Sequence, residues 1–239
     1  MRPMKTIRLG IRGSDRLFPE GIPSTSNILL FGSPGSGKTI FAIEALYRGI
    51  EKFNETGVYV SFEESAQSIH DQASAVGWNL KKYIRQSKLI VLNFKIDEID
   101  RNLINMIVKE VRRIKASRLV IDTLSMLSLS PAFSGDNNFT VLDGEKVKLA
   151  YNSAQFIYNL IHILDRLRTV TFYLTFCKPD SISTFDGVSE YVCDGILHLR
   201  TRSMGKAFLR SIEALKMRKV NAVGGIHAFK ITGSGIEVE

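Results

Sequence analysis

Short apolar runs alternate with longer segments of helical period along most of the chain. Each short run has the length of a strand, and each longer segment places its apolar residues on one face of a helix. This alternation is typical of a parallel sheet whose strands are joined by crossover helices. The predicted strands are residues 28–31, 57–61, 89–93, 119–121 and 170–175, and the predicted helices are residues 39–51, 65–76, 98–114 and 151–167.

The pattern changes after residue 193, where the runs GILHLRT, AFLRSIEALKM, HAFKIT and GIEVE are joined by short basic or Gly-rich turns. These runs resemble antiparallel strands. The sequence therefore predicts an α/β fold with a sheet that is parallel in its centre and antiparallel at one edge. With 239 residues and 44% hydrophobic composition, we expect one domain over residues 1–239. The polar segment 130–148 is too long and too rich in Gly, Pro and Asn for a simple connection, and the sequence does not indicate its role.

The charge and the cysteines narrow the choice of environment. A net charge of +8 favours anionic partners such as nucleotides, nucleic acid or an anionic membrane surface, and does not choose among them. The two cysteines, Cys177 and Cys193, have no Cys-x-x-Cys or Cys/His spacing, so buried, reduced thiols are expected rather than a disulfide framework or a zinc site. No apolar stretch approaches the length of a membrane span, and we expect a cytoplasmic protein.

Residues 32–39 read GSPGSGKT, that is Gly32, Ser33, Pro34, Gly35, Ser36, Gly37, Lys38 and Thr39. They fit the template G-x-x-x-x-G-K-[ST] at its fixed positions, Gly32, Gly37, Lys38 and Thr39. Glycines let the backbone N–H groups turn inward toward phosphate oxygens, and the following helix adds its N-terminal partial charge. Lys38 is expected to reach the β- and γ-phosphates of a nucleotide, and the Thr39 hydroxyl to bind Mg²⁺. A Gly-rich turn can also be only a turn, but the apolar strand before this loop and the helix after it match the context that the template requires.

Two further acidic positions belong to the same predicted edge of the sheet. The run LVID ends at Asp122, which is expected to approach Mg²⁺ through water, although a strand can also end in Asp as a helix cap. The run VYVSFEES places Glu63 and Glu64 after the strand 57–61, where one carboxylate can orient or deprotonate a water molecule. The simpler alternative is that these glutamates only favour the N-terminus of the next helix. Of the two, Glu63 is the preferred catalytic candidate.

The succession of GSDRLFPEGIP, FGSPGSGKT, VYVSFEES, VGWNLKKY, LVIDTLS, SEYVCDGILHL and ALKMRK resembles the KaiC-type branch of the RecA/RadA ATPase superfamily, especially its archaeal single-domain members. The resemblance covers nearly the whole chain. It implies a RecA-like fold, ATP with Mg²⁺, and assembly into a homo-oligomeric ring, usually a hexamer, with nucleotide between subunits. We therefore expect an ATP-binding protein with slow ATPase activity. The resemblance also implies that Lys216 and Arg218 act in trans on the γ-phosphate of a neighbour. Residues two apart on a strand share a side, so both can reach one anion, and a solvated basic strand is the simpler alternative.

The chain departs from the family pattern at three places. Lys219 follows the Lys-Met-Arg triplet where Gly is usual, so the local turn is expected to differ. Relatives often have Thr-Ser-Glu where this chain has Thr175, Phe176 and Cys177. The glutamate that could sense the γ-phosphate is therefore absent from this position. The segment 130–148 is longer than expected for a single-domain relative.

Two other functions stay open. One is DNA binding by a recombinase paralogue in DNA repair, but the loops that would hold the strand contain more acidic than basic residues, and Arg112, Arg113 and Lys115 lie elsewhere. The other is a self-phosphorylating signalling ATPase, for which Ser183 and Thr184 are the candidate acceptors, although such pairs are also ordinary turn formers. The protein partner and the process that ATP drives are not predicted.

Overall fold

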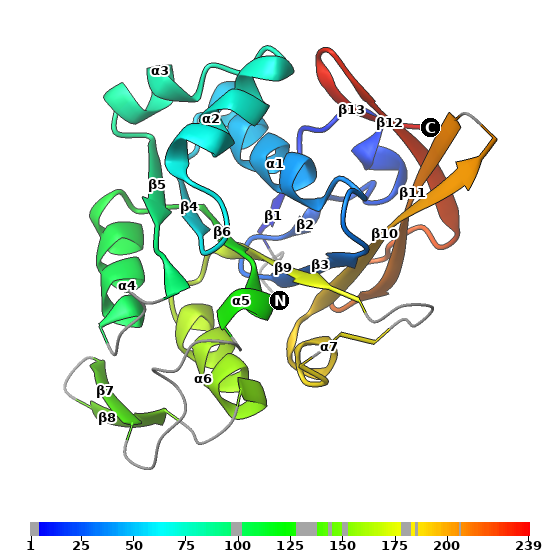
Figure 1. Cartoon of the computed structure of the whole chain (residues 1–239). Coiled ribbons are helices and arrows are strands. Elements are labelled where there is room, and N and C mark those ends of the chain that lie inside the picture. Colours follow the sequence, from blue (N-terminus) through cyan, green and yellow to red (C-terminus); the bar gives the residue numbers. More distant parts are fainter. Residues whose placement is uncertain are drawn as a thin grey trace.

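A nine-stranded sheet forms the centre of the protein in a computed structural model (Figure 1). The structure describes residues 5–96, 102–127, 138–142, 145–149, 153–177, 183–184, 186–205 and 207–239. The strands lie in the order β13 (Gly235–Val238), β12 (Ile226–Thr232), β11 (Ala207–Met217), β10 (Gly195–Met204), β3 (Asn27–Gly32), β9 (Val170–Phe176), β6 (Arg118–Asp122), β4 (Gly57–Ser61) and β5 (Leu89–Asn93).

The six strands from β10 to β5 pair in parallel, and β11, β12 and β13 pair antiparallel beyond β10. This mixed sheet confirms the predicted α/β fold with antiparallel strands at one edge. The central strands β3, β4 and β6 are buried along their whole length, as expected for parallel strands that are covered on both faces.

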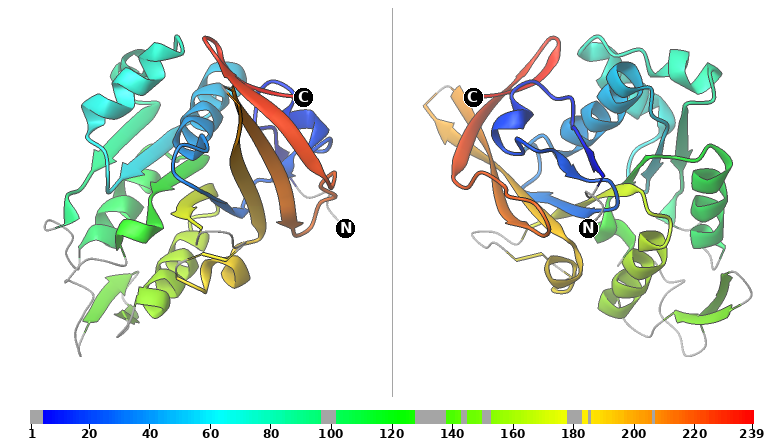
Figure 2. Two further views of the ribbon diagram at one scale, coloured as in Figure 1. Left: turned by 45° about the vertical axis from the view of Figure 1, so that its right-hand side comes forward. Right: turned by 180° about the vertical axis from the view of Figure 1, so that it is seen from behind.

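Helices cover both faces of the sheet (Figures 1 and 2). On one face, α1 (Lys38–Phe53), α2 (Ala66–Ala75) and α3 (Leu80–Arg85) pack against a core that contains Leu30 and Tyr59. On the other, α4 (Leu103–Arg113), the short α5 (Leu124–Leu127) and α6 (Ser153–Asp165) pack against a core that contains Leu29 and Phe31. Neighbouring residues of one strand thus point into different cores, as the pleat requires.

The helix bounds follow local sequence signals. Helix α2 begins after Ser65, whose side chain accepts a hydrogen bond from the Ser68 N–H, a standard N-cap. Helix α4 is described from Leu103, so the first residues of the predicted helix 98–114 lie outside the described part. The sequence did not predict α3, whose six residues are too few to show a helical period, nor the four-residue helix α7 (Ser189–Val192).

Arg118 ties the N-terminal segment to the start of β6. Its side chain is fully buried and donates to Glu55 Oε2 at 2.5 Å, to the Ala45 carbonyl at 2.5 Å and to the Leu9 and Arg8 carbonyls at 3.2 and 2.6 Å. These bonds satisfy a buried charge that would otherwise be costly. The N-terminal segment itself contains the strand pair β1 (Thr6–Ile7) and β2 (Ile22–Pro23) and the 3₁₀ turn η1 (Ser14–Arg16).

Part of the unassigned segment 130–148 forms a hairpin of β7 (Asn138–Leu142) and β8 (Glu145–Leu149). The rest of that segment lies outside the described residues. Cys193 is buried, whereas Cys177 is only partly buried, so the expectation of two buried thiols is wrong for Cys177. Within the described ranges, no helix is both long and apolar enough to cross a bilayer.

Candidate functional site

The Gly-rich loop connects the carboxyl end of β3 to the first turn of α1. Gly32 lies so close to β10 that a Cβ there would be 2.0 Å from the Leu199 carbonyl oxygen. Gly37 precedes α1 with φ of 97°, a left-handed conformation that favours glycine. Ser36 is buried within the loop, where its N–H donates to the Ser33 carbonyl at 3.2 Å. Since the first N–H groups of a helix lack intrahelical acceptors, the loop presents donors of the kind that bind phosphate.

Lys38 lies at the floor of this loop. Its ammonium donates to the carbonyls of Gly32 and Ser33, both at 2.9 Å, and lies 4.7 Å from the centre of the Phe176 ring. Burial lowers the pKa of Lys38 to about 8, although the nearby Asp122 acts in the opposite direction. The loop therefore holds a cation whose charge depends on pH near the physiological range.

Asp122 and Thr39 meet at the same edge of the sheet. Thr39 Oγ1 donates to Asp122 Oδ2 at 3.2 Å, and the buried Tyr59 hydroxyl donates to the same oxygen at 2.5 Å. Burial raises the pKa of Asp122 to about 6, while the bonds from Tyr59 and Thr39 lower it. A hydroxyl and a carboxylate are hard oxygen ligands that suit Mg²⁺, which keeps several waters and binds few protein groups. The side chains present thus fit this ion.

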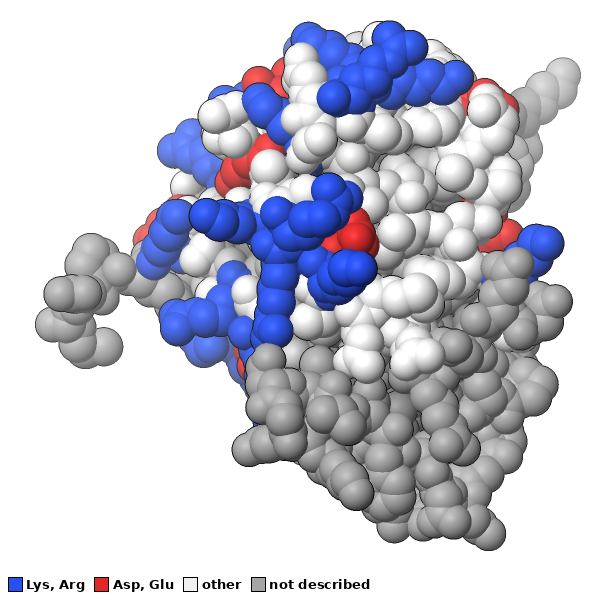
Figure 3. Space-filling view, turned by 90° about the vertical axis from the view of Figure 1, so that its left-hand side faces the viewer, with Lys and Arg blue, Asp and Glu red and all other residues white. Residues whose placement is uncertain are grey.

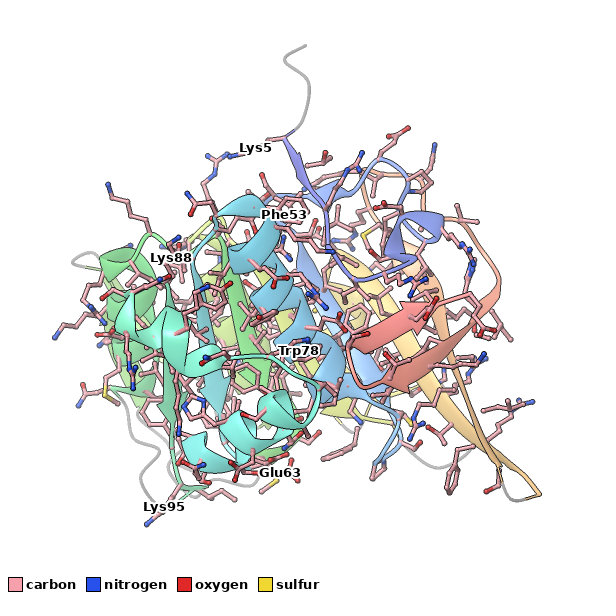
Figure 4. The ribbon with its side chains drawn as sticks, turned by 90° about the horizontal axis from the view of Figure 1, so that it is seen from above. Lys5, Phe53, Glu63, Trp78, Lys88 and Lys95 are labelled. Carbon is pink, nitrogen blue, oxygen red and sulfur yellow. The ribbon has the colours of Figure 1, made fainter. Side chains whose placement is uncertain are left out.

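The two glutamates after β4 differ in their contacts. Glu64 accepts hydrogen bonds from Ser68 Oγ, at 2.5 Å, and from Gln72 Nε2, so its carboxylate is fixed against α2. Glu63 is exposed, lines the cavity at the loop and has no hydrogen-bond partner among the described residues; Figure 4 shows it beside α2. A carboxylate with open lone pairs can accept a proton from water, which favours Glu63 over Glu64 as a base.

These groups surround one cavity of about 340 Å³. The loop contributes Pro34, Gly35, Gly37, Lys38 and Thr39, and the strand ends contribute Glu63, Glu64 and Asp122. The sequence did not predict the remaining wall, which is formed by Ile40, Gln72, Thr123, Phe176 and Ile231. The sequence also did not single out Tyr59. This residue lies two positions before the last residue of β4, and residues two apart on a strand point to the same face of the sheet.

Lys216 and Arg218 lie away from this cavity. Lys216 pairs in register with Ile196 on β10, whereas the Gly-rich loop begins beside Leu199, three residues further toward the carboxyl edge. The strands β10 and β3 are neighbours, and each residue of a strand advances about 3.3 Å. Lys216 therefore lies on the order of 10 Å from the start of the Gly-rich loop, toward the amino edge of the sheet. The two basic side chains therefore do not share a site with Lys38 of the same chain.

Both basic side chains instead reach the end of α7. Lys216 Nζ donates to the carbonyls of Glu190 and Cys193 at 2.9 and 2.6 Å, and Arg218 Nη2 donates to the Tyr191 carbonyl at 3.3 Å. Arg218 stays half exposed, at 51% of its side chain. Lys219 has φ of 69°, so a lysine makes the left-handed turn that glycine usually makes.

Thr184 is held in a structural contact. Its side chain is fully buried, and Thr184 Oγ1 donates to Glu190 Oε2 at 2.7 Å. Glu190 thereby links Thr184 to α7, whose carbonyls bind Lys216. A buried, bonded hydroxyl is not presented to an incoming phosphoryl group, whereas Ser183 is exposed.

A mostly parallel sheet, a Gly-rich phosphate loop between β3 and α1, and an aspartate at the end of β6 together define a P-loop protein of the RecA type. The chain belongs to the KaiC family: the family model described as "ATPase: KaiC" matches residues 7–135 and 145–239. This confirms the resemblance read from the sequence.

Individual relatives agree with this assignment. The chain is 32% identical over 244 residues to the circadian clock oscillator protein KaiC of Thermostichus vulcanus, covering 98% of this chain and 44% of that protein. It is 30% identical over 238 residues to the circadian clock protein KaiC2 of Synechocystis sp., covering 96% of this chain and 39% of that protein. The chain thus spans less than half the length of these curated relatives. A solved KaiC-like protein from Pyrococcus horikoshii superposes with a TM-score of 0.83 at 27% identity, covering 99% of this chain and 100% of that one.

Proposed function

We propose that this chain binds ATP with Mg²⁺ at its Gly-rich loop and hydrolyses it slowly, as one ATPase domain over residues 1–239. The observation that carries the proposal is the convergence of Lys38, Thr39, Asp122 and Glu63 on one cavity. These four side chains come from three separate elements of the sheet edge, and together they offer a cation, two oxygen ligands and a base. Membership of a family of ATPases supports the same activity.

Each group has a role that follows from its position. The loop N–H groups and the Lys38 ammonium bind the phosphates, and Thr39 and Asp122 are the residues that would hold Mg²⁺. Bound Mg²⁺ would offset the phosphate charge during transfer. Glu63 orients the attacking water and accepts its proton, since it is the open carboxylate of the cavity.

Assembly supplies what a single chain lacks. Lys216 and Arg218 lie toward the opposite edge of the sheet from the loop, so they can act on phosphate only in another subunit. A ring of identical subunits would place these cations against the γ-phosphate bound by a neighbouring subunit. By analogy with the family, this ring is expected to be a hexamer. In that position they would stabilise charge on the transferring group. We expect the ring to work in the cytoplasm as a nucleotide-driven regulatory or assembly ATPase with a protein partner that is still to be identified.

Calorimetry with Mg²⁺ and ATP tests the binding site. Lys38→Ala removes the cation that hydrogen bonds hold at the loop, and we expect ATP affinity to fall by about 100-fold or more, since charge-assisted bonds to phosphate are strong. Lys5→Ala, which removes an exposed lysine outside the cavity, should bind ATP as the unmodified protein does. Equal affinity in both variants would contradict the proposed phosphate site.

A further inference from the structure

The open edge of the sheet, at β5, is surrounded by basic side chains. Figure 3 shows this side of the molecule, where Lys and Arg gather over α3, β5 and α4. We define the basic face by the Lys and Arg residues of α3, β5, α4 and the segments that follow α3, β5, α4 and α6, namely Lys81, Lys82, Arg85, Lys88, Lys95, Lys109, Arg112, Arg113, Lys115, Arg166 and Arg168. All of these residues except the half-buried Lys88 are exposed. Lys88 and Lys95 lie at opposite ends of β5, so the charge extends along the whole strand (Figure 4).

Few acidic residues offset this charge. Residues 80–96, 102–117 and 165–169 contain eleven Lys and Arg residues and two acidic residues, Glu110 and Asp165. Both carboxylates already have partners: Glu110 pairs with Arg113 at 2.6 Å, and Asp165 accepts from Asn27 Nδ2 at 2.8 Å. The segment 97–101 adds three acidic residues and one arginine by sequence and lies outside the described part. These described segments therefore carry a large excess of positive charge, and the acidic neighbours of α3 from other elements are Asp71 of α2 and Glu51 of α1.

Helix dipoles explain only part of this charge. Cations stabilise the last turn of a helix, and Arg112 and Arg113 occupy that turn in α4. Lys88, Lys95 and Lys109 lie outside such turns. Mutual repulsion of so many like charges costs stability, which a polyanionic partner would offset.

The basic face also contains a hollow. A cavity of about 260 Å³ between the ends of α4 and α6 is lined by Arg112, Lys115 and Arg166, with Val111, Ala116 and Leu167 as its apolar walls. Three cationic side chains around one cavity suit a phosphate group. The remaining basic residues continue away from this cavity over α3 and β5, which suits a chain of phosphates rather than one small anion.

The exposed apolar side chains of the basic face help to decide which kind of polyanion it can bind: a membrane surface, a single strand or a double helix. Within the segments 80–96, 102–117 and 165–169, Met106 is the only large apolar side chain with substantial exposure, and no aromatic residue there is exposed. A membrane-binding surface inserts aromatic or aliphatic side chains into the bilayer, and a single-strand site stacks bases on aromatic rings. Contact through phosphates alone is typical of sequence-independent binding to a double helix.

We propose that the basic face binds double-stranded nucleic acid through its phosphate backbone. None of the residues that define this surface lines the ATP cavity. Fluorescence anisotropy with a short labelled DNA duplex, over a series of salt concentrations and with Mg²⁺ and ATP present, tests the proposal. We expect affinity to fall steeply with salt, because phosphate contacts release counterions.

The decisive comparison uses two triple variants of equal charge. Lys81→Gln with Arg85→Gln and Lys109→Gln removes three of the eleven basic side chains of the basic face, and should weaken duplex binding by about 10-fold or more and reduce the salt slope by up to about 0.9 for each lost phosphate contact. Arg16→Gln with Arg202→Gln and Lys230→Gln removes the same charge from exposed positions near the other end of the sheet and should bind almost as the unmodified protein does.

Three results would overturn the proposal. The first is equal binding by both triple variants, which would indicate a general effect of net charge. The second is tighter binding to single-stranded than to duplex DNA. The third is binding to vesicles containing phosphatidylserine without binding to the duplex, which would assign the basic face to a membrane.

Discussion

The Tyr59 hydroxyl donates a hydrogen bond to Asp122 Oδ2 at 2.5 Å, and both side chains are buried, at 1% and 6% exposure. Thr39 donates to the same oxygen. Tyr59 lies on β4 and Asp122 on β6, so the bond crosses between neighbouring strands. A donor that fixes one carboxylate oxygen orients the other, as partners of metal ligands commonly do. Tyr59 is thus a positioning residue for the proposed Mg²⁺ site.

Tyr59→Phe should therefore weaken the response to Mg²⁺. We expect the Mg²⁺ concentration for half-maximal ATP hydrolysis to rise by about 10-fold, in the range for lost partners of metal ligands. Because the Tyr59 bond lowers the pKa of Asp122, the acid limb of the Mg²⁺ dependence should also move to higher pH. Steady-state phosphate release over a grid of Mg²⁺ and pH measures both changes.

Tyr173→Phe is the matched control. Tyr173 is also fully buried in the sheet, but its hydroxyl donates to Asn27 Oδ1 at 3.3 Å, away from the cavity. The control should alter stability without moving the Mg²⁺ dependence or its pH profile. Equal shifts in both variants would mean that Tyr59 acts only through packing.

The pH dependence of Mg²⁺–ATP binding should have two limbs. Asp122, with its pKa raised to about 6, loses the charge that attracts Mg²⁺ as the pH falls through that value. Lys38, with its pKa lowered to about 8, loses its proton as the pH rises through that value, so affinity should fall by up to about 10-fold per pH unit above it. Calorimetry from pH 5 to pH 10 measures this profile. The alkaline limb should begin near the Lys38 pKa of about 8.

Removal of Mg²⁺ with a chelator separates the two limbs. Without the metal, the alkaline limb from Lys38 should persist, and the acid limb from Asp122 should weaken. A profile that is flat between pH 7 and pH 10, around the lowered pKa of about 8, would contradict the role of Lys38.

Glu64→Gln should affect stability more than turnover. Ser68 and Gln72 both donate to Glu64 Oε2, so a glutamine can keep these bonds through its carbonyl oxygen but loses the negative charge that strengthens them. We expect the free energy of unfolding to fall by about 1–2 kcal/mol, with hydrolysis within a few fold of normal. Chemical denaturation and phosphate release measure the two effects. Loss of hydrolysis with unchanged stability would transfer the catalytic role to Glu64.

Arg218→Ala tests the shared site. The Arg218→Ala chain keeps its own cavity intact, so it should bind ATP normally. It should fail to support hydrolysis in the neighbouring subunit, where Arg218 would act on the γ-phosphate. Mixing Arg218→Ala chains with Glu63→Gln chains, under conditions of shown subunit exchange, should create interfaces where an intact Glu63 faces an intact Arg218. Activity above both parents is expected. Inactive mixtures that still assemble, or a protein that stays monomeric with ATP, would restrict Arg218 to its bond with α7.

The parallel core could be predicted because its strands are short apolar runs with clear ends. The bounds 57–61 and 89–93 agree with β4 and β5, and β11 was also predicted over its full length. The Gly-rich loop was equally clear, because glycine spacing and helix context occur within one short stretch. Helix α3 was missed because its six residues cannot show a period.

Contacts between distant residues could not be predicted. The bond from Tyr59 to Asp122 depends on the register of β4 against β6, which no local pattern encodes. The contact of Lys216 with α7 depends on the pairing of β10 with β11 and on the irregularity between Ile196 and Leu197. Phe176 was noted as a departure from the family pattern, but its position over Lys38 follows only from the packed structure.

Hydrolysis by Glu63→Gln at saturating Mg²⁺ and ATP, with bound nucleotide measured in the same samples, tests whether Glu63 is the base. The glutamine keeps the size of the side chain and removes the base. We expect ATP to remain bound with near-normal affinity while phosphate release falls by about 100-fold or more. Near-normal phosphate release from this variant, with ATP bound at the Gly-rich loop, would show that Glu63 is not the base for hydrolysis.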